Sequence, residues 1–227
     1  MTELTPDECR VLGTLIEKAL TTPGQYPLSL NSLVTGVNQK NNRDPVVEID
    51  EDGALRAVDG LRAKGFARDV SFTGSRVEKY RHTAGERLEV RAPELAILSE
   101  LFLRGPQTVG ELRGRASRMH PFESLEIVEQ VLKTLAERSA PLEPLVRELP
   151  PAPGSRATRW MQLLCEDLHP TGSSAHASSP SMARSEERAG STDRLAALEA
   201  RVAALEAIVS AAVAELRASR EIPPGRT

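Results

Sequence analysis

The chain has 227 residues, 40% apolar and 27% charged, which is ordinary for a soluble protein with one large domain or two small ones and a tail. Aromatic residues make up only 3%, so the core must consist mostly of Leu, Val and Ala, a composition that favours small helical domains over a β-sandwich. A formal net charge of −3 argues against a protein that coats polyanions, and any nucleic-acid site must rest on a local basic patch.

Cysteine usage and the N-terminus indicate the cellular compartment. Cys9 and Cys165 are far apart in the sequence and have no His or Cys at ligand spacing, so we expect neither a zinc site nor a disulfide framework. The acidic N-terminus lacks the apolar stretch of a signal peptide, and no run reaches the ~20 apolar residues of a membrane span. We expect a cytoplasmic protein with reduced thiols, no metal and no membrane partner.

The first part of the chain predicts three helices followed by a β-hairpin. A capped, acidic start at Thr5 to Glu8 opens the first helix, Ser29 opens a second that ends near Asn38, and Asp50 or Asp52 opens a third that closes at Lys64-Gly65. Two short extended segments, 66–70 and 76–81, flank a Gly-containing turn. This order is that of a winged helix-turn-helix, in which the hairpin is the wing.

The same order is predicted a second time. Helical patterns begin at Glu94, Thr108 and Ser124, and a second hairpin follows between 145 and 164. Arg76-x-x-Lys79-Tyr80 in the first hairpin matches Arg156-x-x-Arg159-Trp160 in the second, which indicates duplication better than helix periodicity does.

The C-terminal part has a different composition. A Ser-, Pro- and Ala-rich stretch predicts a disordered linker, and the heptad-spaced seam after it predicts a coiled coil that holds a homodimer, with a lone Ala-rich surface helix as the alternative. The candidate dimerisation residues are Leu195, Leu198, Val202, Leu205, Val209 and Leu216.

The predicted fold is thus mainly α with small β-hairpins: two tandem winged helix-turn-helix domains and a C-terminal coiled-coil helix. The predicted divisions are winged-helix domains at 1–90 and 91–167, a linker at 168–191, the coiled coil at 192–220 and a tail at 221–227.

Several long motifs resemble a known bacterial family. They include Val11 to Lys18, Tyr26 to Asn31, Asn38 to Val46 and Leu103 to Arg113, with further matches at 22–23, 114–116 and 118–119. With these motifs the stretch from about residue 3 to 166 resembles the YceH-like proteins, an uncharacterised family catalogued as a domain of unknown function. The resemblance implies tandem winged-helix domains in a bacterial cytosolic protein, and it implies no reaction.

The sequence contains no constellation typical of an enzyme. We find no phosphate-binding glycine loop, no nucleophile elbow and no pair of histidines at metal-ligand spacing. His82 and His120 read as surface histidines rather than catalysts. We therefore expect a protein that is not an enzyme, with no cofactor and no small-molecule ligand.

Binding to double-stranded DNA is the function that the predicted fold suggests, with regulation of transcription as the process that such binding would serve. The third helix of each domain, which would enter the major groove, holds more acidic than basic residues, so phosphates would repel it unless the acids face away. Basic and amide groups gather elsewhere. The candidate contact residues are Asn38, Gln39, Lys40, Asn42, Arg43, Arg76, Lys79, Arg81, Arg113, Arg115, Arg118, Arg156 and Arg159.

Each of these candidates has a structural alternative. The amides near Lys40 could read base edges or could cap helix ends and order a turn. Tyr80 and Trp160 could stack on bases or could anchor their hairpins to the core. The competing function is a protein-interaction scaffold, because winged helices also serve in complexes that do not touch DNA.

Overall fold

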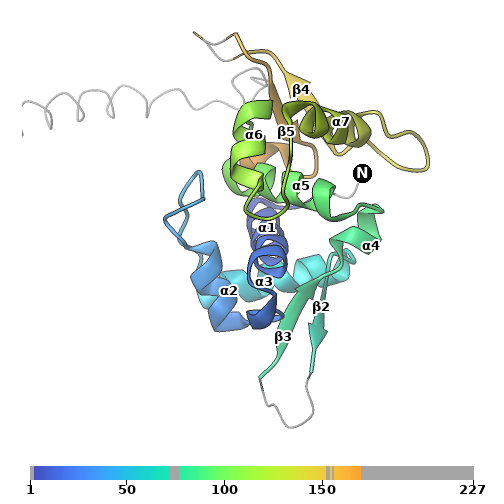
Figure 1. Ribbon diagram of the computed structural model, residues 1–227. Helices are drawn as coiled ribbons and strands as arrows, with labels where there is room; N and C mark the ends of the chain where they lie inside the picture. Colours follow the sequence, from blue (N-terminus) through green and yellow to red (C-terminus); the bar gives the residue numbers. More distant parts are fainter. Residues whose placement is uncertain (1–2, 72–76, 152–153, 155, 170–227) are drawn as a thin grey trace, which may run out of the picture. The chain divides into compact units, whose positions relative to one another are not determined.

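The computed structural model describes residues 3–71, 77–151, 154 and 156–169 (Figure 1). Within this part the chain is mainly helical, with two small antiparallel sheets. Residues Met1–Gly172 form one compact unit. The predicted coiled coil, its six dimerisation residues and nearly all of the predicted linker lie outside the described residues, and so does Arg76.

The first half contains the three predicted helices and a three-stranded sheet instead of a two-stranded hairpin. A short strand between the first two helices adds to the hairpin, so that the strand order is β1-β3-β2. The elements are α1 (Pro6–Thr21), a 3-10 turn (Pro23–Gln25), β1 (Leu28–Ser29), α2 (Leu30–Val37), α3 (Glu51–Ala63), β2 (Ala67–Val70) and β3 (Lys79–His82).

The second half repeats this order, after a five-residue helix that the sequence did not predict. Its hairpin strands pair with each other, and Gln107 forms an isolated bridge with Trp160. The elements are α4 (Ala84–Leu88), α5 (Ala92–Arg104), α6 (Val109–Ala116), α7 (Leu125–Ala136), β4 (Val146–Leu149), β5 (Arg159–Gln162) and a final 3-10 turn (Glu166–Leu168).

Side-chain caps explain where the helices begin. The Thr5 hydroxyl accepts from the Glu8 N–H while the Glu8 carboxylate accepts from the Thr5 N–H, which satisfies two backbone donors at the start of α1. Ser29 caps α2 and Asp50, rather than Asp52, caps α3. These positions agree with the predicted helix starts because each cap is a local interaction.

Strand register gives the two halves the same arrangement. Tyr80 lies opposite Leu28 on one side and Asp69 on the other, and Leu28 immediately precedes the cap of α2. Trp160 likewise lies opposite Glu148 and bridges to Gln107, which immediately precedes the Thr108 cap of α6. The matched hairpin motifs therefore occupy equivalent places.

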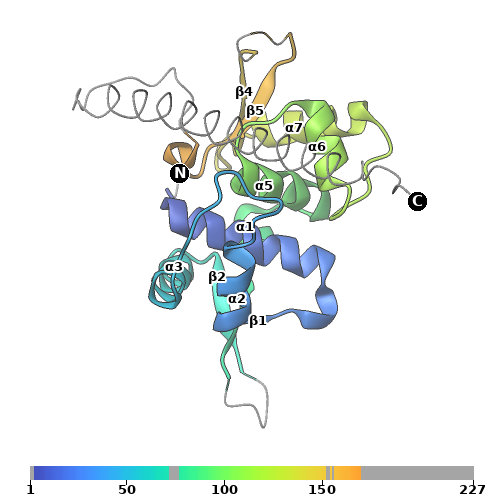
Figure 2. The ribbon, with the colours of Figure 1, turned by 90° about the vertical axis from the view of Figure 1, so that its left-hand side faces the viewer.

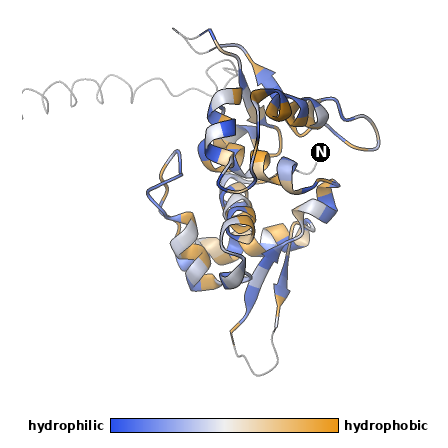
Figure 3. Ribbon diagram, in the orientation of Figure 1, coloured by the Kyte–Doolittle hydropathy of each residue, from blue (hydrophilic) through white to orange (hydrophobic). Residues whose placement is uncertain are grey.

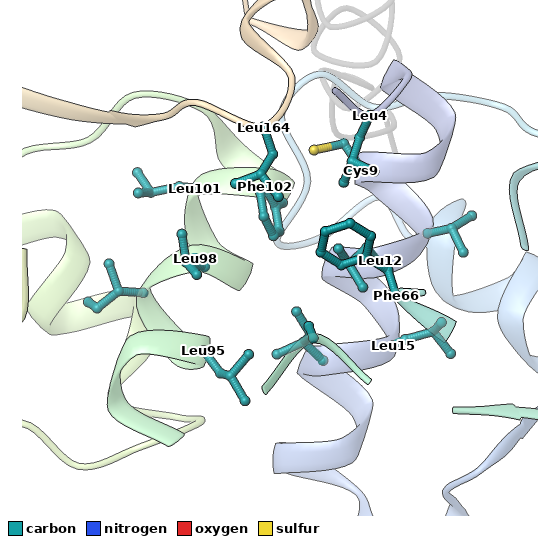
Figure 4. Packing of buried hydrophobic residues seen from close by; sticks show 14 of the residues in the cluster. Leu4, Cys9, Leu12, Leu15, Phe66, Leu95, Leu98, Leu101, Phe102 and Leu164 are labelled. Carbon is teal, nitrogen blue, oxygen red and sulfur yellow. The ribbon is translucent and has the colours of Figure 1, made fainter. Parts of the chain in front are cut away.

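Helices α1 and α5 join the halves through one continuous apolar core. Leu12, Leu15, Leu98 and Phe102 are fully buried between or beside these helices (Figures 2 and 4). Burying one such side chain contributes about 1.5–3 kcal/mol. The predicted boundary between residues 90 and 91 thus falls inside a single packed unit.

The two helices approach closely at Gly13. A β-carbon at this position would lie 3.0 Å from Leu103 Cγ and from Phe102 Cβ, so a larger residue would require these side chains of α5 to shift. The Ser99 hydroxyl donates to the Gly13 carbonyl across the contact, at 3.0 Å. Farther along, the Leu4 N–H donates to the Leu164 carbonyl at 2.8 Å, which attaches the N-terminal segment to the end of the second half.

Candidate interaction surface

The loop between α2 and α3 is largely hydrophilic (Figure 3), but its central arginine points inward. Arg43 is 5% exposed, and its Nη2 donates to Glu17 Oε2 at 2.6 Å and to the Gly36 carbonyl at 2.8 Å. A guanidinium buried in this way is not available to a phosphate. Arg43 therefore holds its own loop against α1 and does not form part of an exposed contact surface.

The same cluster includes charged groups from the second half. Arg118 donates to Glu17 Oε1 and, at 2.6 Å, to Glu100 Oε1. Both carboxylates are buried, with side chains 1% and 0% exposed, and Arg104 lies 3.4 Å from Glu100 Oε2. Two carboxylates and three guanidiniums thus form an ion cluster between the halves, in which both carboxylates and Arg43 are buried.

Burial alone would raise the pKa of Glu17, because desolvation penalises its charged form. Hydrogen bonds and positive charge from Arg43 and Arg118 outweigh that effect and hold the pKa below its usual value. Glu17 is consequently ionised when the protein is folded.

The amides of the loop have structural partners. Asn38 donates to and accepts from the backbone of Ile49, both at 2.8 Å, and Gln39 Oε1 accepts from Lys18 and Arg43 at 3.3 Å. The side-chain oxygen of Asn42 accepts from Arg104. Of the candidates in this loop, Lys40 alone has an exposed side chain with no partner among the described residues.

The candidate arginines around α6 are also engaged. Arg113 donates to the carbonyls of Phe122 and Glu123, which fastens α6 to the start of the α7 segment. Arg115 donates to Gln107 Oε1 at 2.8 Å and pairs with Glu111 at 3.2 Å. Together with Arg118, these side chains stabilise the second half.

The hairpins contain the remaining candidates. Lys79, Arg81 and Arg159 are partly buried, whereas Arg156 is exposed. Tyr80 and Trp160 are 3% and 9% exposed, as an anchoring role requires, so neither ring is available to stack on a base. Arg81 lies directly opposite Arg68 across the β2–β3 ladder, and like charges in that position repel.

His82, at the end of β3, is not the surface histidine that the sequence suggested. Burial and the neighbouring Arg81 lower its pKa to about 4, so the ring is neutral at physiological pH. Its backbone N–H donates to the Tyr26 hydroxyl at 2.6 Å, which joins β3 to the segment before β1.

The outer faces of α3 and α7 carry acidic and aliphatic side chains. On α3, Glu51, Asp52 and Leu55 are exposed, and Arg62 is paired with Asp59 at 3.0 Å and with Asp69 at 2.8 Å. On α7 the exposed groups include Leu125, Glu126, Ile127 and Glu129. The sequence left open whether the acidic residues of these two helices face away from a bound nucleic acid. In the structure they lie on the exposed faces of α3 and α7.

Sequence reasoning missed three buried charges, namely Arg10, Glu17 and Glu100. Arg10 is 1% exposed and donates to the carbonyls of Leu103 and Pro45, so it connects α1 to α5 and to the loop. A signal for Glu100 was present, since it interrupts the apolar run Leu95 to Leu103, where an unpaired charge would be costly.

The described residues provide neither a set of metal ligands nor a membrane span. Across residues 3–71, 77–151, 154 and 156–169, no group of three or more His, Cys, Asp or Glu side chains could hold a metal ion. No helix in these ranges is long and apolar enough to cross a membrane. Cys9 and Cys165 are buried thiols that form no disulfide.

Comparison with known proteins places these features in a family context. The family described as "Protein of unknown function, DUF480" matches residues 4–169. The chain is 50% identical over 192 residues to a UPF0502 protein of Geobacter sulfurreducens, with 85% of each chain covered. It is 57% identical over 156 residues to a UPF0502 protein of Citrifermentans bemidjiense, covering 69% of this chain and 71% of the relative. A UPF0502 protein of Hahella chejuensis is 46% identical over 184 residues, covering 79% and 83%.

Proposed function

The chain belongs to the DUF480 family, a family described as of unknown function, and from its geometry we propose a non-enzymatic module that binds a protein partner through winged-helix halves. The element order α1-β1-α2-α3 followed by β2 and β3, with strand order β1-β3-β2, supports the winged-helix assignment. The second half, with α5-α6-α7 before β4 and β5, supports a tandem arrangement.

The observation that carries the protein-binding function is the chemistry of α3 and α7. A winged helix that reads DNA places its third helix in the major groove, against phosphates on both sides. Here those helices expose carboxylates next to Leu55, Leu125 and Ile127. Arg62 of α3 is paired with Asp59, and Arg113 donates to the Glu123 carbonyl near the start of α7. Arg56 is exposed on α3 but is outnumbered there by the exposed acids. Exposed aliphatic groups favour contact with a protein partner, and the carboxylates around them repel a polyanion.

Site-specific photo-crosslinking in cells tests this function. Leu55 and Ile127 are replaced in turn by p-benzoylphenylalanine, and Glu86 on α4 receives the same substitution as a control. We expect a discrete protein adduct at position 55 or 127 that is missing at position 86. Adducts to nucleic acid alone, or the same products at all three positions, would contradict the proposal.

Binding of double-stranded DNA through the first hairpin is the second candidate function. Arg68 and Arg81 face each other across β2 and β3, and neither forms an ion pair among the described residues. A phosphate between the two guanidiniums would relieve their repulsion. Exposed Lys40 is a further group that could contact the DNA backbone.

Salt-dependent binding of a labelled DNA duplex, followed by fluorescence anisotropy, tests the second candidate. If the hairpin contacts phosphates, Arg68→Ala should weaken binding and reduce the salt slope by about one unit, whereas Lys133→Ala on α7 should not. Equal slopes for wild type and both variants, or no binding at low salt, would exclude this role of the hairpin.

A further inference from the structure

A groove beside α3 offers a more specific site than the helix faces alone. It has a volume of about 770 Å³ and lies where the starts of α1 and α3 meet α2 and the segment before α3. Ligand-binding clefts in proteins commonly span about 300–1,000 Å³. The groove is thus large enough to accept several side chains of a partner.

The apolar part of the lining comes from three aliphatic residues. Val34 of α2, Val47 and Ile49 line the groove, and Val46 beside them is 55% exposed. The two hydrogen bonds between Asn38 and the Ile49 backbone fasten this segment to the end of α2. The wall is therefore formed before any partner binds, which lowers the entropic cost of binding.

The charged part of the lining is mainly acidic. Asp7, Glu48 and Asp50 line the groove together with one cation, Arg56. Asp50 also caps α3 by accepting from the Gly53 N–H at 2.7 Å, whereas Glu48 is exposed on the segment before it. An acidic rim around aliphatic side chains attracts cations and disfavours nucleic acid.

We propose that this groove binds a basic segment of a partner protein, with aliphatic side chains against Val34, Val47 and Ile49 and Lys or Arg beside Glu48 and Asp7. The inference rests on the proposed protein-binding function and specifies the chemistry of the partner. Charge complementarity selects this occupant, since a DNA strand would meet three carboxylates and an acidic peptide would meet the same repulsion.

The test uses two labelled synthetic peptides, one combining Leu with Lys and the other combining Leu with Glu in the same positions. Fluorescence anisotropy with the full chain should show clearly tighter binding of the Lys peptide, and this preference should weaken as salt is raised. Equal affinity for the two peptides, or displacement of the Lys peptide by an equal concentration of duplex DNA, would overturn the inference.

Two variants and one control locate the binding. Glu48→Lys reverses a rim charge and should weaken Lys-peptide binding about fivefold or more, while Glu86→Lys makes the same change on α4, outside the proposed binding surface, and should leave it unchanged. Val47→Thr keeps the volume of the side chain but adds a hydroxyl, and it should also weaken binding. Circular dichroism confirms that each variant is folded.

The outcomes separate this inference from the function on which it rests. If Glu48→Lys and Glu86→Lys weaken peptide binding equally, or if neither does, the groove is not the site. The crosslinking experiment at Leu55 and Ile127 can still identify a protein partner in that case. If that experiment yields no protein adduct, the proposed function fails independently of the peptide result.

Discussion

Glu17 shows how one buried carboxylate holds several parts of the protein together. It lies on α1, and it accepts hydrogen bonds from Arg43 of the loop and Arg118 beyond α6. Its removal therefore leaves two guanidiniums without their shared partner. Breaking a buried pair commonly costs more than the pair contributes, because the remaining charge stays desolvated.

Glu17→Gln should lower the free energy of unfolding at pH 7 by about 3 kcal/mol. The pKa of Glu17 is depressed in the folded state, so its contribution is complete above its unfolded pKa of about 4.3 and is lost as the pH falls through the folded value. The difference in the free energy of unfolding between the variant and the wild type should become smaller below about pH 4. Urea unfolding at a series of pH values from 7 to below 4 measures this difference, with Glu129→Gln as the exposed control. A difference independent of pH would contradict the assignment.

Single residues were predictable from the sequence only where their role is local. The exposure of Lys40 and the cap at Ser29 follow from neighbouring residues. The burial of Arg43 does not, because it depends on Glu17, which lies 26 positions earlier on another helix. The polar sequence of the loop between α2 and α3 therefore predicted a binding surface, although Arg43 in this loop is buried.

At the scale of elements, capping determines where α6 begins. The Thr108 hydroxyl accepts from the Glu111 N–H, and Glu111 in turn accepts from the Thr108 N–H at 3.0 Å. Because Gln107 bridges to Trp160 just before this cap, the start of α6 also fixes the edge of the second sheet.

Thr108→Ala should lower the free energy of unfolding by about 1 kcal/mol, the usual cost of losing an N-cap hydroxyl. Thr108→Ser retains the hydroxyl and should recover most of that loss. Thermal unfolding followed by circular dichroism compares the three proteins. Equal destabilisation by Ala and Ser would show that packing of the threonine methyl, rather than the cap, matters here.

Most helices and hairpin strands could be predicted because their caps, turns and apolar spacing are encoded within each segment. The exceptions are short. The five-residue α4 contains too little sequence for a helical period, and the two-residue β1 exists only through its pairing with Lys79 and Tyr80. Such elements depend on the tertiary context.

At the scale of the whole molecule, the arrangement of the halves could not be predicted. Periodicity identified the apolar faces of α1 and α5 but not that they pack on each other. Gly13 and Ser99, where the helices meet, are small residues that carry no such signal by themselves. In the structure both halves belong to one compact unit, Met1–Gly172.

A fragment ending at residue 90 should therefore fold poorly, because it exposes the α1 face that α5 covers. We expect a broad unfolding transition and binding of a hydrophobic dye, compared with a cooperative transition for residues 1–172. Adding a fragment of residues 91–172 should restore cooperativity if the α1–α5 contact is the cause. A sharp transition of the short fragment alone would contradict this expectation.

The homodimer remains a prediction from the heptad pattern. Deleting residues 192–227 should change the mass in solution from dimer to monomer, as measured by light scattering, because the deletion removes the predicted seam. Replacing Leu205 and Val209 with Asp should have the same effect without shortening the chain. A monomeric full-length protein, or a dimer that survives both changes, would contradict the prediction.

The hydrogen bond between Leu4 and Leu164 has a consequence for synthesis on the ribosome. Residues that contact each other in the finished protein are translated far apart in time, and at about 5–20 residues per second the interval is on the order of 10–30 seconds. In the first part of that interval, until α5 (Ala92–Arg104) has been synthesised, the apolar face of α1 has no α5 to cover it. The nascent first half is therefore the stage at which this protein most needs protection from aggregation, and a chaperone that binds exposed aliphatic helices would act there.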